Sequence, residues 1–183
     1  MIFVASRRTS TKREISMEPG EILSTTAQIA VALAGFAGVV VVFRRESVHE
    51  WSPIDKFRLR LLLINSVFPL VLCMIGLLLL GVRPEPPGIW RWCSGLAFVV
   101  LLLFGIMTMT GYRRLDLLRL QGRHANLIFY FFATLGIGSD LLQLYNAALL
   151  NAFWPFFTGI VFQLVAAIFQ FARMILSPPE SVR

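Results

Sequence analysis

The chain has few charged residues and very few of the residues that build metal or disulfide frameworks. Of its 183 residues only 15% are charged, and it holds two cysteines and two histidines. Soluble domains are about 25% charged and about 45–50% apolar, so this composition argues against a soluble domain. Cys73 and Cys93 both lie in apolar runs. We interpret them as small hydrophobic residues and expect neither a disulfide scaffold nor a Cys/His metal cluster.

The sequence also lacks the short motifs that usually announce catalysis. It contains no Gly-rich phosphate loop, no His-Glu-x-x-His helix and no Gly-x-Ser-x-Gly elbow. His49 and His124 are expected in separate loops, where solvated side chains are the favoured interpretation. A metal site built from them with Glu50 or Asp116 is the alternative. No surface gathers the His or acidic clusters typical of membrane enzymes. We therefore expect neither an enzyme nor a cofactor.

Long apolar runs are the main feature that is present. Hydrophobic residues make up 57% of the chain, and the mean hydropathy is +0.74. About 20 apolar residues in a helix cross a hydrocarbon core of about 30 Å. The sequence therefore predicts an all-α, polytopic transmembrane helical bundle. Its five spanning helices are expected at 22–43, 61–82, 92–112, 127–150 and 153–176.

Three segments follow from this pattern. Residues 1–20 form a polar N-terminal extension, 21–177 the transmembrane helical domain and 178–183 a C-terminal tail. Met17 stands just before the first run, so a true start at Met17 is an alternative to Met1. No cleaved signal peptide is indicated, because the first apolar run is itself a full span.

Basic residues predict how the bundle is oriented. They concentrate after the first, third and fifth runs, at Arg44, Arg45, Lys56, Arg58, Arg60, Arg113, Arg114, Arg119, Arg123, Arg173 and Arg183. The other side holds Arg83, Arg91 and the basic residues of the extension. The positive-inside rule then puts the N-terminus outside and the C-terminus inside. The net charge of +7 is explained by these flanks, so we expect no nucleic-acid partner.

One helix start can be identified from the residues alone. Ser52 is suited to the N-cap, Pro53 to the first helical position, and Asp55 to a capping-box-like position. The helix that contains the second span should therefore begin at residue 53, well before its apolar run.

Asp140 is the acid that lies well inside an apolar run. An ionisable side chain at such depth is costly and normally finds a partner in a bundle or a wet cavity. With the orientation above, Gln28, Gln143 and Gln163 fall in the same outer-half layer, and no Arg or Lys lies at that depth. These four residues are the predicted ion or proton pathway. Two alternatives remain open: a protonated Asp140 that only bonds helices together, and a partner protein that supplies a cation.

Small residues recur on the first span at Ala30, Ala34 and Gly38. Small-xxx-small rows allow helices to approach closely in lipid. We expect this row to pack within the subunit, with a contact between subunits as the alternative.

The stretch EILSTTAQIAVALAGFAGVVVVFRR and the following WSPIDKFRLRLLL carry a family resemblance. Together they resemble a group of small bacterial inner-membrane proteins of unassigned function, mainly over residues 21–63. The resemblance implies a multi-pass protein of the bacterial inner (plasma) membrane. It implies no activity and transfers no functional residue.

These observations lead to two functional hypotheses. The first is an oligomeric channel- or transporter-like protein for a small ion or proton, with Asp140 as its titrating site. Oligomers are expected because five helices enclose little room for a pathway. The second is a non-transporting accessory or scaffold subunit that docks a partner membrane protein. Under both hypotheses the protein lies in the lipid bilayer, and its expected partner is a second copy of the chain or another membrane protein.

Overall fold

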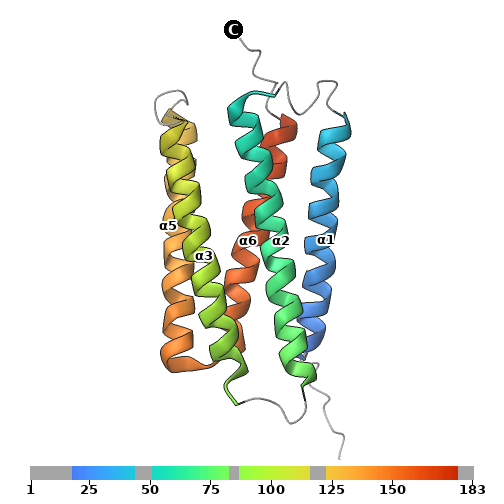
Figure 1. Cartoon of the computed structure of the whole chain (residues 1–183), viewed down its shortest axis with the longest axis vertical. Helices are drawn as coiled ribbons and strands as arrows, with labels where there is room; N and C mark the ends of the chain where they lie inside the picture. The colour runs from blue at the N-terminus through green and yellow to red at the C-terminus, as the bar shows by residue number, and fades with distance from the viewer. Residues whose placement is uncertain (1–17, 44–50, 83–86, 116–122, 177–183) are drawn as a thin grey trace, which may run out of the picture.

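The computed structural model describes residues 18–43, 51–82, 87–115 and 123–176. Within these ranges the chain is helical and has no strand (Figure 1). In the described part of the chain, five helices are long and apolar enough to cross a membrane, which confirms the predicted all-α bundle. The elements in chain order are α1 (Pro19–Phe43), α2 (Pro53–Gly81), α3 (Ile89–Arg114), α5 (Arg123–Tyr145), the π-helical segment η1 (Asn146–Leu150) and α6 (Phe153–Leu176).

The helices run alternately up and down, so α1 begins at one end of the bundle and α6 ends at the other (Figure 1). Helices α1, α2 and α6 pack against one another, and α3 and α5 form a pair beside them. Figure 1 shows α1 at one flank and α5 at the opposite flank, with α2 and α6 between them. The loop that holds His49, residues 1–17 of the N-terminal extension and the C-terminal tail lie outside the described residues, and the last two residues of the predicted extension, 19–20, belong to α1.

The predicted N-cap and first residue of α2 are confirmed. The Ser52 hydroxyl accepts a hydrogen bond from the backbone N–H of Asp55 at 3.1 Å, and Pro53 occupies the first helical position. The cap satisfies one of the backbone donors that every helix start leaves free. Helix α2 therefore begins at residue 53, and its polar first turns extend beyond the apolar run.

Helices α1, α2 and α6 meet in a dense apolar core. The fully buried side chains include Leu23, Leu62, Leu72, Phe156 and Ile160. Gly76 lies at a close contact among them, because a Cβ there would lie 2.8 Å from Leu23 Cδ1 and 3.5 Å from Phe156 Cε1. Close packing of this kind holds helices together in lipid, where hydrocarbon tails are as apolar as the side chains.

The packing face of α1 differs from the predicted row. Ala30 is fully buried, but Ala34 is only half-buried, and Gly38 is exposed with nothing within 4 Å of a Cβ built on it. The face that packs within the subunit continues instead from Ala30 to Leu33 and Ala37. The eight residues from Ala30 to Gly38 turn the helix by two full turns and about 80° more, so Gly38 points to another side than Ala30. The seven residues from Ala30 to Ala37 make almost two full turns, so these two residues share one face.

The contacts of α3 with α5 and with the adjoining η1 include one toward each end of α3. Tyr112 stacks on Phe129 with ring centroids 3.7 Å apart, and its hydroxyl donates to Asn126 Oδ1 at 2.8 Å. Near the other end, a Cβ on Gly95 would lie 3.9 Å from Ala147 Cβ. Between these contacts α5 leaves much of its surface exposed, so the pair is more open than the core of α1, α2 and α6.

Candidate functional site

The turn between α5 and α6 is organised by two asparagines. Asn146 is fully buried and donates to Ser94 Oγ at 2.7 Å and to the Ala152 carbonyl at 2.9 Å. Its own Oδ1 accepts from the Ala152 N–H at 2.9 Å. Asn151 adopts the left-handed region (φ 52°), and its side-chain oxygen accepts from the Arg91 N–H at 3.0 Å. Both asparagines thus tie the turn to the start of α3.

Gln143 is the residue of the predicted pathway whose position is best defined. Its side chain is fully buried, and its Nε2 donates to the Pro155 carbonyl of α6 at 2.6 Å. Gly159 makes room for it, because a Cβ at Gly159 would lie 2.6 Å from Nε2. The Oε1 of Gln143 is buried without a hydrogen-bond partner. Gln143 therefore bonds α5 to α6 with its amide and leaves an unpaired acceptor at the same contact.

Two further oxygens near Gly159 are buried without partners. A Cβ on Gly159 would lie 3.7 Å from Ser139 Oγ, which has no hydrogen-bond partner. Gln163, one turn further along α6, is buried, and its Oε1 is also unpaired. Buried polar side chains usually find partners, so unpaired oxygens on consecutive turns of α5 and α6 are unusual.

Asp140 lies between the two contacts that join α5 and η1 to α3. Counting from Ala147 beside Gly95 and from Phe129 stacked on Tyr112, the antiparallel register places Asp140 at the level of Leu101 and Leu102 of α3. The side chain is half-buried, and its Oδ1 is buried with no hydrogen-bond partner. No ion pair within the described ranges involves Asp140. Its nearest polar neighbours along the helix are Ser139 and Gln143.

The structure does not bring Gln28 to this site. Gln28 is exposed on α1, and α1 and α5 occupy opposite flanks of the bundle (Figure 1). Equal depth was the basis for grouping it with Asp140, but two residues at one depth meet only if their helices are neighbours. The candidate site is therefore composed of Asp140, Gln143 and Gln163, together with Ser139.

The sequence-based set missed Ser139, Asn146 and Asn151. Ser139 adjoins Asp140, so its place in the layer could have been read from the sequence. The asparagines stand at the end of an apolar run and in the following link, where side-chain amides commonly bond to freed backbone groups. Their pairing with Ser94 and Arg91 depends on α3 lying beside the turn, which the sequence does not reveal.

Comparisons of this chain with protein-family models, with curated proteins and with solved structures give no match.

Proposed function

We propose that this protein moves protons or small cations across a membrane, with Asp140 as the group that takes up and releases the ion. The observation that carries the proposal is the buried Oδ1 of Asp140, which has no hydrogen-bond partner in the middle of a spanning helix. A carboxylate in hydrocarbon is costly, and such residues commonly mark proton relays and ion pathways. Protonation of the Asp140 carboxylate, or binding of a cation to it, would remove this cost of burying a negative charge.

The neighbouring oxygens support this proposal. Ser139 Oγ, Gln143 Oε1 and Gln163 Oε1 are buried acceptors that have no partner in the described part of the chain. Hydroxyl, amide and carboxylate oxygens are the ligands that hard cations prefer. A proton carried by Asp140 or by a water molecule would find acceptors there as well. The set suits a cation or proton better than an anion or an organic solute.

An assembly of several copies fits the exposure of α5. Leu141, Leu144 and Tyr145 beside Asp140 are exposed, and α5 buries little of its surface in one subunit. We place the pathway along the α3–α5 flank, where a second copy would cover Asp140.

The charge distribution supports the proposed orientation, with the N-terminus outside and the C-terminus inside a bacterial inner membrane. Among the described residues, the end of the bundle where α6 terminates carries Lys56, Arg58, Arg60, Arg113, Arg114 and Arg173, whereas the opposite end carries Arg91. Basic residues concentrate on the cytoplasmic side of membrane proteins.

Flux into proteoliposomes tests the proposal directly. The wild type should acidify or load vesicles under a proton or cation gradient, and Asp140→Asn should reduce that flux at least tenfold. Gln28→Leu is the matched control, because Gln28 is an exposed polar residue of α1 on the opposite flank, and its flux should equal that of the wild type. Absence of flux in the wild type across pH and several cations would refute the proposal.

A specific feature of α1 favours the second function, an accessory subunit. Gly35 and Gly38 are exposed, and a Cβ on either would meet nothing within 4 Å. The outer face of α1 therefore has room for a closely packed helix of another membrane protein. Under this function Gly38→Leu would abolish co-purification of the partner, and the protein alone would show no flux.

A further inference from the structure

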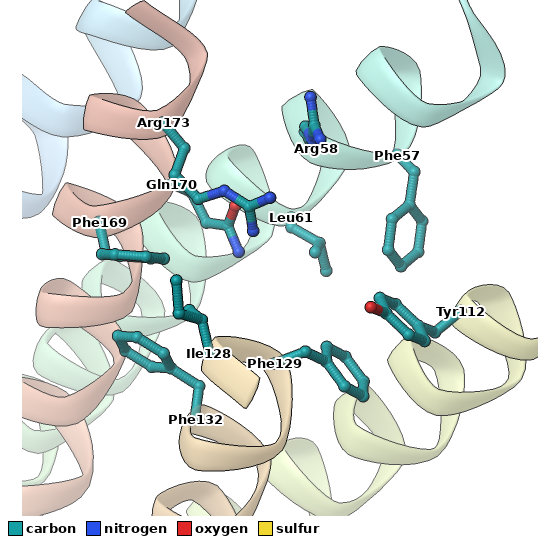
Figure 2. Close-up of a pocket in the computed structure, with 10 residues that line it drawn as sticks. All are labelled: Phe57, Arg58, Leu61, Tyr112, Ile128, Phe129, Phe132, Phe169, Gln170 and Arg173. Atoms are coloured by element: carbon teal, nitrogen blue, oxygen red, sulfur yellow. The ribbon is translucent and has the colours of Figure 1, made fainter. Parts of the chain in front are cut away.

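Four helices surround a hollow at the basic end of the bundle, far from Asp140. It has a volume of about 50 Å³ and lies among α2, α3, α5 and α6 (Figure 2). We call it the arginine hollow and define it by its polar residues Arg58, Gln170 and Arg173 and by the rings of Phe57, Phe129 and Phe132. Figure 2 shows Arg173 and Gln170 reaching from α6 toward the rings of the other helices.

The balance of charge in the hollow is positive. Arg58 pairs with Asp55 at 3.5 Å, but no carboxylate lies within ion-pair distance of Arg173 in the part of the chain that the structure describes. Arg58 and Arg173 line the same hollow, and each carries a positive charge. Like charges repel more strongly where the surroundings are partly apolar. The Arg173 guanidinium therefore has no anionic partner among the described residues. An anionic ligand would balance its charge.

Size and surroundings narrow the chemistry of that anion. A cavity of about 50 Å³ holds roughly three to five water molecules at about 10–15 Å³ each, which limits the ligand group to a small polar one. Arginine is suited to phosphate because its planar fork can bind two oxygens at once. Gln170 adds an amide whose buried Oε1 has no partner, so it can accept from a hydroxyl of the same ligand.

The position of the hollow indicates where the phosphate comes from. Arg173 lies in the last turn of α6, and Arg58 lies near the start of α2, so both are at the depth of lipid headgroups. Ile128 lines the hollow and is also exposed on the surface of α5, so the hollow reaches the lipid-facing side. Basic pockets between helices at a cytoplasmic surface are suited to anionic headgroups.

We propose that the arginine hollow binds the phosphate of an anionic phospholipid, with Arg173 as its main cationic contact. The headgroup enters past Ile128, and the acyl chains follow the apolar surface of α5. This site is separate from Asp140 and does not depend on the transport proposal.

Thermal unfolding of the purified full chain in a neutral detergent tests this proposal. Phosphatidylglycerol should raise the Tm in a saturable manner, whereas phosphatidylcholine and millimolar inorganic phosphate should not. Arg173→Gln should weaken the apparent affinity for phosphatidylglycerol about tenfold or more, because it removes a charge-assisted contact. Arg113→Gln is the matched control, since Arg113 is exposed at the same end and should leave the affinity unchanged.

A second variant keeps the test decisive if Arg173→Gln does not fold. Ile128→Trp changes an exposed residue at the mouth of the hollow and leaves both arginines in place. It should also lose the response to phosphatidylglycerol. Three results would overturn the proposal: equal shifts with both lipids, an equal shift with inorganic phosphate, or the same loss in Arg113→Gln as in Arg173→Gln.

Discussion

The two halves of this bundle are held together by different interactions. Helices α1, α2 and α6 interlock through apolar side chains around Phe156, and Gly76 lets them approach closely. The α3–α5 pair and its contact with α6 depend on a few specific contacts, including the Tyr112–Phe129 stack and the hydrogen bonds of Asn146 and Gln143. The first half resembles a scaffold, and the second carries every residue of the candidate transport site except Gln163.

The difference indicates where this protein can accommodate a polar site. A dense core has no room for an ion or water, because every gap there removes packing contacts. The α5 flank leaves buried oxygens unpaired at Ser139, Asp140 and Gln143. Unpaired polar groups are a stability cost, so the α5 flank, which keeps three of them close together in the chain, is a good candidate for function.

The largest effect on stability should come from the scaffold half. Phe156→Ala removes a fully buried ring from between α1, α2 and α6. We expect a loss of about 3 kcal/mol, the lower end of the range for buried Phe, because the unfolded helices remain in an apolar medium. Unfolding in mixed micelles measures it. Phe131→Ala, at an exposed position of α5, is the control and should change little. Equal losses for the two variants would contradict the division into halves.

The next effect should come from the turn that anchors the α5 half. Asn146→Ala removes two donated hydrogen bonds and one accepted one, and it leaves Ala152 without its partner. With about 0.6 kcal/mol for an average side-chain bond in a membrane protein, we expect a loss of about 2 kcal/mol. The same unfolding assay measures this loss. Asn151→Gly, which keeps the left-handed conformation accessible, should cost less.

A smaller effect is expected at the α5–α6 contact. Gly159→Ala places a Cβ 2.6 Å from Gln143 Nε2, which is already held by the Pro155 carbonyl. Either the helices separate or the hydrogen bond breaks, for a cost of about 1–2 kcal/mol. Gly138→Ala is the matched control on α5, because nothing lies within 4 Å of a Cβ there. Its stability should stay unchanged or rise slightly.

The smallest effect on stability should occur at Asp140 itself. Asp140→Leu removes a carboxyl group whose Oδ1 makes no hydrogen bond, so the free energy of unfolding should stay within about 0.5 kcal/mol or rise. If Asp140 only bonds helices together, the same change should destabilise the protein by about 1 kcal/mol or more. The unfolding measurement thus separates a structural role from a transport role without any flux assay.

Much of the fold could be predicted from the sequence, because lipid requires each spanning segment to satisfy its own backbone. Hydropathy and length therefore identified five helices, and the cap at Ser52 identified the start of α2. The observed helices extend beyond the predicted spans where polar turns continue them, as at residues 53–60. Asp140 was recognisable as unusual by its depth alone.

Which side chains meet was decided by the tertiary structure. Hydropathy fixes the depth of a residue in a spanning helix, but it does not fix the neighbours of that helix or its rotation, because the lipid-facing and buried faces are both apolar. The sequence placed Gln28 and Asp140 at one depth, but their helices lie on opposite flanks, and Ala30 is buried while Gly38 is exposed. Arg58 and Arg173, far apart in the sequence, line one hollow because α2 and α6 pack side by side.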